Sequence, residues 1–194
     1  MAEAILLRFL LYIGLIHYPV YNKNRKRIAS AITNFDLHDL SRVARTFGVK
    51  KFFVISPLRD QQALAERILR HWTIGHGASY NRYRKEAIQL ITIVSSLEDS
   101  IKDIAEIEGE EPLLIATDAS KQAERSITYS AATDIINSER VVILLFGTAW
   151  GLASEVIHKA DYILEPIEGG ADYNHLSVRS AAAIILDRLA GKYQ

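Results

Sequence analysis

The chain has 194 residues, no cysteine and a formal net charge of zero. This length is enough for one domain with its own core, and the balanced charge gives no general indication of nucleic-acid binding. The absence of cysteine excludes disulfides, thiol nucleophiles and cysteine-based zinc sites, and it suits a reducing cytoplasm, where we expect the protein. The six histidines are scattered without metal-ligand spacing, so no metal is expected.

Charge is unevenly distributed along the chain. Residues 22–51 hold eight Lys or Arg and two acids, whereas residues 97–111 hold seven acids and one Lys. This asymmetry favours an anionic partner on one side, although two solvated faces would give the same pattern. The basic loop at residues 22–27 is either a solvated hairpin tip or a contact for phosphate.

The first apolar run, residues 5–16, carries Arg8 and is too short to span a bilayer. It lacks the basic start and cleavage pattern of a signal peptide, so no membrane segment is expected. Residues 10–16 are predicted to form a core strand. Residues 1–9 are expected to be an N-terminal extension that packs on the rest of the chain.

Apolar strand-like runs then alternate with helical patterns. The expected strands are residues 11–17, 52–56, 90–94, 113–117, 141–146 and 162–164, with 28–33 either a strand or part of the basic loop. The expected helices are residues 37–47, 59–72, 96–108, 128–138 and 175–189, with a short helix beginning at 82. This alternation predicts an α/β fold with a mostly parallel sheet of about six strands flanked by helices. Without a repeat or linker, residues 1–194 are expected to be one domain.

Helical spacing also predicts which side chains face the core. In the helix 37–47, which Asn34, Phe35 and Asp36 are expected to cap, the inward residues are Leu37, Leu40, Val43, Ala44 and Phe47. In the helix 59–72 they are Leu64, Ile68 and Trp72. Residues 75–81 contain two glycines and are expected to be a loop.

The last two strands are each followed by a turn rich in glycine or proline. Residues 147–152 follow the first strand and residues 165–170 the second. Ligands of open α/β sheets bind beyond the carboxyl ends of strands, and free backbone groups in such turns can bind a polar ligand. The first turn matches neither the phosphate loop nor the dinucleotide fingerprint. The residues alone therefore indicate only a site for a small polar ligand.

Three motifs together resemble the SPOUT class of S-adenosylmethionine-dependent RNA methyltransferases, from about Tyr12 onward. The first is Asp36, five residues, Arg42, five residues, Gly48, where ribose methyltransferases of the class begin with Asn. The second is the strand 141–146 with the turn 147–152. The third is Pro166-Ile167-Glu168-Gly169 followed by His175-Leu176-Ser177-Val178-Arg179, where the class has Ser-Leu-Asn-Val-Ser. The run 174–179 is similar to a bacterial branch of unassigned substrate.

This resemblance implies a C-terminal trefoil knot, which no sequence pattern predicts by itself. It also implies methyl transfer to tRNA or rRNA, at a ribose 2′-oxygen or a base nitrogen, by a homodimer with Trp150 and the final helix as interface elements. The class usually has Glu in the second motif, where Ala149 or Trp150 stands here, and the third motif also departs. A non-catalytic RNA- or nucleotide-binding module is therefore the alternative.

The resemblance also assigns residues to roles. The cofactor-binding candidates are Thr117, Phe146, Gly147, Thr148, Gly151, Leu164, Pro166, Ile167, His175, Leu176 and Ser177. The RNA-binding candidates are Lys23, Arg25, Lys26, Arg27, Arg42 and Arg45. Arg42 and His175 are the catalytic candidates, since a guanidinium stabilises developing negative charge and an imidazole accepts a proton.

A purely structural role remains the alternative for several of these residues. Arg42 could instead form an ion pair on the helix surface with Asp36 or Asp39. His175 could have no role beyond its position just before the last helix. Thr117 and Ser177 could be ordinary turn or cap residues. The glycines of the turn permit close backbone approach, so a bulky residue at Gly147 is expected to abolish cofactor binding with the fold mostly intact.

Overall fold

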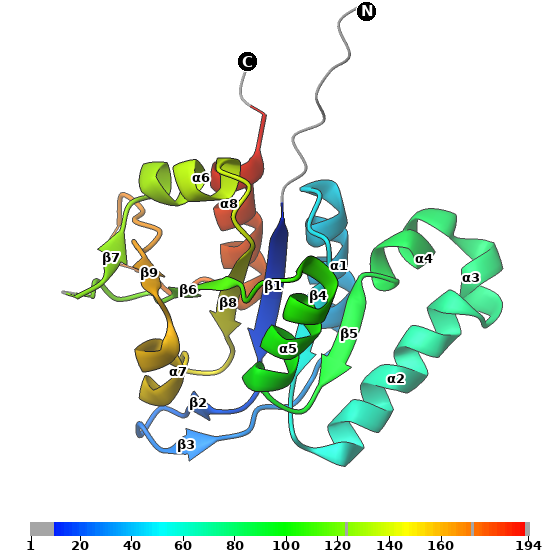
Figure 1. The fold of residues 1–194 in the computed structure, drawn as a ribbon. Helices are drawn as coiled ribbons and strands as arrows, with labels where there is room; N and C mark the ends of the chain where they lie inside the picture. The colour runs from blue at the N-terminus through cyan, green and yellow to red at the C-terminus, as the bar shows by residue number, and fades with distance from the viewer. Residues whose placement is uncertain (1–9, 123, 172, 193–194) are drawn as a thin grey trace, which may run out of the picture.

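The computed structural model describes residues 10–122, 124–171 and 173–192, so the expected N-terminal extension, residues 1–9, lies outside the described part. Seven parallel strands form one sheet in the order β5-β4-β1-β8-β6-β9-β7 (Figure 1). Their bounds are β1 Leu11–Ile16, β4 Phe52–Ile55, β5 Ile91–Val94, β6 Leu113–Thr117, β7 Ser126–Ile127, β8 Val142–Gly147 and β9 Tyr162–Leu164. A separate antiparallel hairpin pairs β2 (Val20–Tyr21) with β3 (Arg27–Ile28).

The central strand of the sheet is β8, and its neighbour β1 pairs with β4 on one side and with β8 on the other. All six residues of β1 are buried, as are all four of β4. Continuous apolar runs such as these are typical of parallel strands covered by helices on both faces. The register pairs Ile16 with Gly147, so β1 and β8 end side by side.

Eight helices are described around the sheet. Their bounds are α1 Asn34–Thr46, α2 Arg59–Thr73, α3 His76–Tyr80, α4 Arg82–Ile88, α5 Leu97–Glu108, α6 Tyr129–Asn137, α7 Ser154–Lys159 and α8 Val178–Ala190. Residues of α1, α2, α4, α6 and α8 share one core cluster, and residues of α5 and α7 belong to a second cluster on the other face (Figure 1). The predicted α/β architecture with a parallel sheet flanked by helices is confirmed.

Several boundaries differ from the predicted ones. The helix α1 begins at Asn34, because Thr33 rather than Asn34, Phe35 or Asp36 is its N-cap. The last helix begins at Val178 and not at residue 175, since the Ser177 side chain caps it. The sheet also has one strand more than the expected six, because Ser126–Ile127 pairs with β9. A strand of two residues is too short to show a periodic pattern in the sequence. Its pairing with β9 depends on where the folded chain places it.

Two further expectations for the helices were wrong. Residues 76–80, expected to be loop, form the short helix α3, and α7 was not expected because six residues show little helical period. Leu64 is exposed, and Ala65 is the buried residue of α2. Residues 28–33 were expected to be either a strand or part of the basic loop, and only Ile28 of them belongs to a strand, β3.

Candidate active site

The carboxyl ends of β8, β6 and β9 meet at one edge of the sheet, because these three strands are parallel neighbours. Thr117 ends β6, Gly147 ends β8 and Leu164 ends β9. The three loops predicted to bind a cofactor therefore begin at the same edge. The helices α1 and α8 begin near this edge as well, and they pack against each other on one face of the sheet (Figure 1).

The turn after β8 is held in shape by its own backbone. A Cβ atom at Gly147 would lie 2.7 Å from the backbone nitrogen of Leu152, whereas one at Gly151 would meet nothing within 4 Å. Gly151 has φ +96 and Ala149 has φ 53, both in the left-handed region. Gly147 is thus required by the turn itself, which corrects the expectation that a bulky residue there would leave the fold mostly intact.

The basic hairpin lies directly against this turn. The backbone nitrogen of Trp150 donates to Tyr21 O at 2.9 Å, and that of Tyr21 donates to Gly151 O at 3.0 Å. Val20 and Leu152 form an isolated antiparallel bridge, and Arg27 pairs with Glu155 at 2.9 Å. The structure therefore brings together the basic hairpin, a candidate contact for phosphate, and the glycine turn, a candidate contact for the cofactor. The two segments are more than a hundred residues apart in sequence.

Several polar groups of the other two loops already form hydrogen bonds within the protein. The Thr117 hydroxyl donates to Leu145 O at 3.0 Å and so ties β6 to β8. The Asn174 side chain donates to Ala119 O at 3.1 Å, which joins the loop after β6 to the one before α8. Ser177 accepts from the Ser180 backbone nitrogen at 3.2 Å, so its cap role is confirmed. These contacts join the end of β6 to β8 and the loop after β6 to the segment before α8.

The side chains of the cofactor candidates divide into two groups. Phe146 and Leu164 are buried in the core cluster, so only their backbone groups could contact a ligand. Leu176 and Ser177 are exposed in front of α8. Open space lies beside Gly151 and Gly169, where an added Cβ would meet nothing within 4 Å. Turns of this kind fit a cofactor that is bound through backbone groups.

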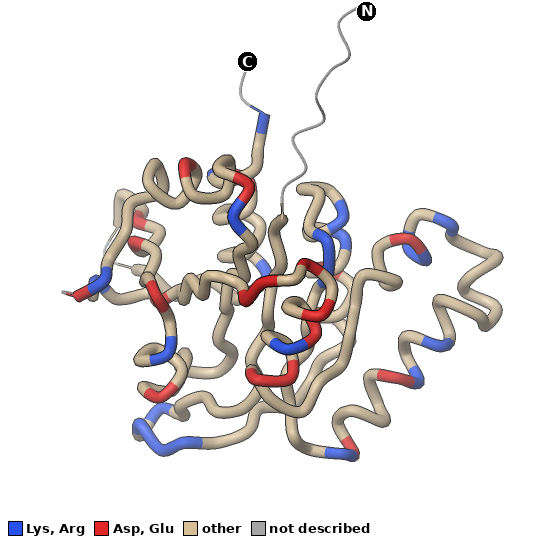
Figure 2. Tube along the Cα trace, in the orientation of Figure 1, with Lys and Arg blue, Asp and Glu red and all other residues tan. Residues whose placement is uncertain are grey.

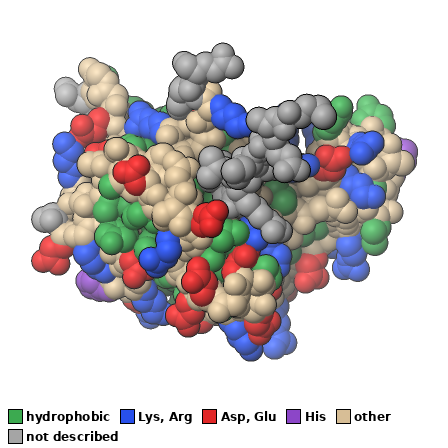
Figure 3. Space-filling model, turned by 45° about the horizontal axis from the view of Figure 1, so that its top comes forward, with side chains coloured by type: hydrophobic (Ala, Val, Ile, Leu, Met, Phe, Trp, Pro, Cys, Tyr) green, Lys and Arg blue, Asp and Glu red, His purple; other side chains and the backbone are tan. Residues whose placement is uncertain are grey.

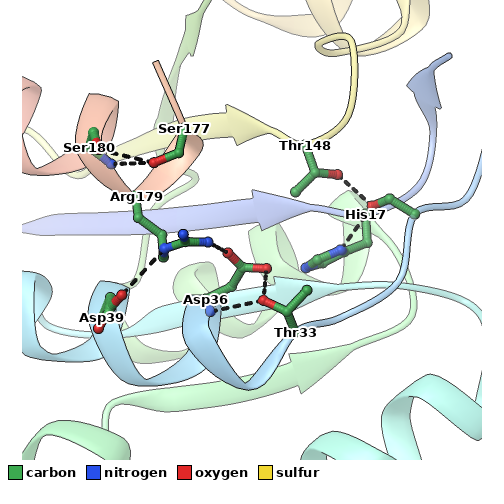
Figure 4. A network of polar contacts seen from close by, with 9 residues as sticks. His17, Thr33, Asp36, Asp39, Thr148, Ser177, Arg179 and Ser180 are labelled. Atoms are coloured by element: carbon green, nitrogen blue, oxygen red, sulfur yellow. Dashed lines mark hydrogen bonds and ion pairs between the residues drawn. The ribbon is translucent and has the colours of Figure 1, made fainter. Parts of the chain in front are cut away.

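An ion pair links the first and third motifs. Arg179 Nη1 donates to Asp36 Oδ1 at 3.0 Å, and Arg179 Nε lies 3.3 Å from Asp39 Oδ2 (Figure 4). Asp36 is only 5% exposed, and its second oxygen accepts the Thr33 hydroxyl at 2.6 Å. Asp36 replaces the usual Asn of the first motif and Arg179 replaces the last Ser of the third. These two departures from the class pattern therefore contact each other.

His17 follows β1 and is fully buried beside the same carboxylate, toward which its ring points in Figure 4. Its Nδ1 lies 3.0 Å from Ser30 Oγ, which lies 2.5 Å from Thr148 Oγ1. Thr148 donates to Ile16 O at 3.0 Å. Burial lowers the pKa of His17 to about 4, against the opposing effect of Asp36, so the ring is neutral at pH 7.

Ser30 Oγ lies between the His17 ring and Thr148 and is within hydrogen-bond distance of both. Thr148 donates in turn to Ile16 O. The Nε2 atom of His17 is buried with no side-chain hydrogen-bond partner among the described residues. The network ties the end of β1 to the glycine turn.

The two catalytic candidates are both accessible. Arg42 lies exposed on α1, and within residues 10–122, 124–171 and 173–192 it has no ion-pair partner in the structure. The alternative that Arg42 pairs with Asp36 or Asp39 is wrong, because Arg179 occupies both acids. His175 is exposed before α8, with its ring 5.4 Å from that of Tyr173.

The RNA-binding candidates differ in how far acids neutralise them. Arg27 pairs with Glu155, and Arg45 lies 3.7 Å from Glu86. Arg25 lies over the Tyr21 ring at 4.5 Å. In the part of the chain that the structure describes, Lys23 and Lys26 are exposed at the hairpin tip without an ion pair. The tip expected from the sequence is confirmed as a hairpin.

Sequence reasoning missed His17, Ser30 and the role of Arg179. A histidine directly after a buried strand was the available signal for His17, since the carboxyl end of a strand is where sites form. Arg179 was visible only as a departure from the third motif. No group of three or more His, Cys, Asp or Glu suited to a metal occurs in the described residues, and no described helix is long and apolar enough to cross a membrane.

Comparisons with known proteins agree with this geometry. Residues 10–191 match the family described as SAM-dependent RNA methyltransferase. A protein of Oleidesulfovibrio alaskensis named tRNA (guanine-N(1)-)-methyltransferase is 44% identical over 181 residues, which are 93% of this chain and 42% of that protein. An uncharacterized protein of Aquifex aeolicus is 38% identical over 179 residues, 92% of this chain and 87% of that protein.

Among solved structures, the SpoU methyltransferase AviRb from Streptomyces viridochromogenes in complex with AdoMet is similar in fold. Its TM-score is 0.57 at 15% identity, and the match covers 94% of this chain and 60% of that chain. The fold is thus that of the SpoU methyltransferases, and the likeness implies their C-terminal trefoil knot.

The family match extends over nearly all of the described residues. The chain belongs to the S-adenosylmethionine-dependent RNA methyltransferases. It spans 42% of the length of the Oleidesulfovibrio relative. The tRNA activity in that relative's name describes the longer protein and does not carry over to this chain by the match alone.

Proposed function

We propose that this chain methylates tRNA at N1 of a guanine, as one domain and with the methyl group coming from S-adenosylmethionine. The observation that carries the proposal is the meeting of the loops after β6, β8 and β9 at one edge, beside the starts of α1 and α8. The names of two relatives, each 42% covered by this chain, support the choice of tRNA and of guanine N1. The proposal requires that the matched segment carries the activity by itself.

The residues at the three loops fit a cofactor held largely by backbone groups. Backbone atoms of Phe146, Gly147 and Leu164 and the loop at Pro166 and Ile167 would surround it, with Leu176 and Ser177 closing the site. The cofactor supplies a methyl group on a sulfonium, which is a good leaving group. The chain must therefore align the acceptor and remove its proton.

The acceptor side is assigned to Arg42 and His175. Loss of the N1 proton leaves negative charge on the guanine, which an exposed guanidinium without an ion pair can stabilise. His175 is the proposed proton acceptor, because its imidazole is exposed just before α8 and a ring nitrogen can take a proton. Lys23 and Lys26, at the tip of the hairpin that lies against the glycine turn, are proposed to contact RNA phosphates. The protein is proposed to act in the cytoplasm.

A methylation assay tests this proposal. The purified chain is incubated with S-adenosylmethionine and bulk bacterial tRNA, and the nucleosides are identified by mass spectrometry. We expect 1-methylguanosine. A different methylated nucleoside would contradict the guanine N1 assignment alone, and the absence of any methylation would contradict the activity of this segment.

Replacing Arg42 separates binding from chemistry. Arg42→Ala should leave the affinity for S-adenosylmethionine unchanged in calorimetry and slow methyl transfer by about 10²-fold or more, the scale for one lost charge-stabilising donor. Arg42→Lys should restore only part of the rate, because the ammonium group of Lys lacks the planar, paired N–H donors of the guanidinium. Wild-type rates in Arg42→Ala would make the residue structural and His175 the leading candidate.

A further inference from the structure

A basic segment lies outside the site described above. Residues 67–85 hold five Lys or Arg and no Asp or Glu, in a chain of zero net charge. They form the end of α2, all of α3 and the first half of α4, which we name the α2–α4 lobe. The lobe projects beyond β5 at one end of the sheet (Figures 1 and 2). A lobe with this charge attracts a polyanion.

The same lobe exposes aromatic side chains. Tyr80 is 79% exposed and Tyr83 is 84% exposed, and Ile74 is 80% exposed. The His76 ring stacks beside Tyr80, with centroids 6.3 Å apart and an interplanar angle of 27°. At the right end of Figure 3, hydrophobic and Lys or Arg side chains lie beside one another, with Asp or Glu side chains among them. Exposed rings interleaved with cations form a surface on which unpaired bases can stack.

The lobe is built on a packed base and is not a free loop. The Arg84 guanidinium lies 4.5 Å from the Trp72 ring centroid, and a Cβ atom at Gly77 would lie 2.5 Å from a Trp72 ring carbon. The Asn81 side chain caps α4 by accepting from the Arg84 backbone nitrogen at 2.9 Å. Because Trp72 packs against Arg84 and Gly77, the backbone that carries the exposed tyrosines is held in place before a ligand arrives, which lowers the entropic cost of binding.

A groove lies beside the lobe, between α2 and the first residue of α1. It has a volume of about 480 Å³ and is lined by Asn34, Leu64, Arg67, Ile68, His71 and Trp72. Asn34 is the first residue of α1, two residues before Asp36, and Trp72 is the base of the lobe. A strand that entered this groove would meet Arg67.

We infer that the α2–α4 lobe binds unpaired nucleotides of the RNA substrate, with bases stacked on Tyr80 and Tyr83 and phosphates on Arg82 and Lys85. The inference rests on the proposed function, which supplies the RNA. Arg82 pairs with Glu86 at 3.0 Å, with the Arg82 side chain 86% and the Glu86 side chain 34% exposed, and an ion pair with so open a cation is weak enough to yield to a phosphate. The absence of acids in residues 67–85 favours a phosphate partner over a protein face.

The test uses the full chain and a fluorescein-labelled single-stranded RNA of 15 nucleotides and mixed sequence. The double variant Tyr80→Leu/Tyr83→Leu keeps apolar area and removes the rings. Its affinity should fall at least about tenfold, since stacking of one base contributes roughly 1–3 kcal/mol. Tyr80→Phe/Tyr83→Phe keeps the rings and should bind within about twofold of wild type. Calorimetry with S-adenosylmethionine should give wild-type affinity for both variants, which checks the fold.

Two further variants compare matched ion pairs. Arg82→Gln should weaken RNA binding and flatten its salt dependence. Lys102→Gln, which breaks the exposed i,i+4 pair with Glu106 on α5, should not. Wild-type RNA affinity in the Leu variant, or equal losses in the Leu and Phe variants, would overturn the stacking inference. A Leu variant that changes oligomeric state would make the lobe a protein interface and overturn it as well. Failure of the wild-type chain to bind any RNA would contradict the proposed function itself.

Discussion

At the scale of single residues, the candidate site depends on buried polar groups that satisfy one another. Asp36 is buried at the first turn of α1, where the Thr33 hydroxyl and Arg179 compensate its charge. The location at a helix N-terminus is also favourable for a carboxylate. The pair Asp36 and Arg179 stands where the class has two neutral residues, so we interpret the two replacements as mutually compensating.

A double-mutant cycle tests this compensation. Arg179→Ser alone should destabilise the chain by about 1–3 kcal/mol, because it removes a charged hydrogen-bond donor from a buried carboxylate that keeps the Thr33 hydroxyl as its other partner. Asp36→Asn combined with Arg179→Ser restores the class residues, and it should be less destabilising than the sum of the single changes by about 1–3 kcal/mol. Unfolding in urea measures each free energy. The exposed pair of Arg45 and Glu86 is the control, with coupling near zero.

His17 predicts a dependence of stability on pH. Its folded pKa of about 4 lies below the unfolded value of 6.5, so the unfolded state binds its proton first as the pH falls. The stabilisation is complete above pH 6.5 and is lost progressively toward pH 4. Between pH 7 and 5 the unfolding free energy should fall by about 2 kcal/mol from this residue. Urea titrations of His17→Asn should lack this part of the slope; equal slopes would contradict a buried neutral ring.

At the scale of elements, the site is made by loops that depend on their strands. The turn after β8 is tightly closed on itself and is bonded to the β2–β3 hairpin, whereas the loop after β9 has open space around Gly169. Two glycines that look alike in the motifs therefore have different roles. Gly147 is required by packing within the turn, and Gly169 is not.

Alanine at each glycine distinguishes these roles. Gly147→Ala should lower the unfolding free energy by about 1–3 kcal/mol, because its Cβ would lie 2.7 Å from the backbone nitrogen of Leu152 and the turn must open. Gly169→Ala should change it by about 0.5 kcal/mol or less. Thermal unfolding of both variants measures the difference. Similar values would mean that the turn after β8 opens easily.

At the scale of the whole molecule, exposed apolar side chains suggest how copies of the chain associate. Trp150 is exposed on the glycine turn, as expected, and Phe35 and Leu176 are exposed at the starts of α1 and α8. Exposed large apolar residues next to a site are often covered by a partner. We propose that a second copy covers them.

Sedimentation at micromolar concentration checks the oligomeric state. A homodimer would have about twice the chain mass of 21.8 kDa. Replacing both Phe35 and Trp150 with Ser should shift the equilibrium to monomer, because apolar area would no longer be buried at the contact. The exposed Ile107 on α5, replaced with Ser, is the control and should leave the dimer intact. A wild-type monomer would contradict a pocket shared between subunits.

The sequence by itself determined six of the seven strands of the sheet, most helices and the three loops, because continuous apolar runs and cap residues are local signals. Phe52–Ile55 and Val142–Gly147 were recognisable from such runs, and the class was recognisable from motif spacing. Their order in the sheet was decided only by tertiary packing, since each strand pairs with residues far away in the sequence. The same reason applies to the contacts of the site. Arg179 pairs with Asp36 and not with a neighbour because α8 packs beside α1. His17 is neutral because the assembled fold excludes water from it.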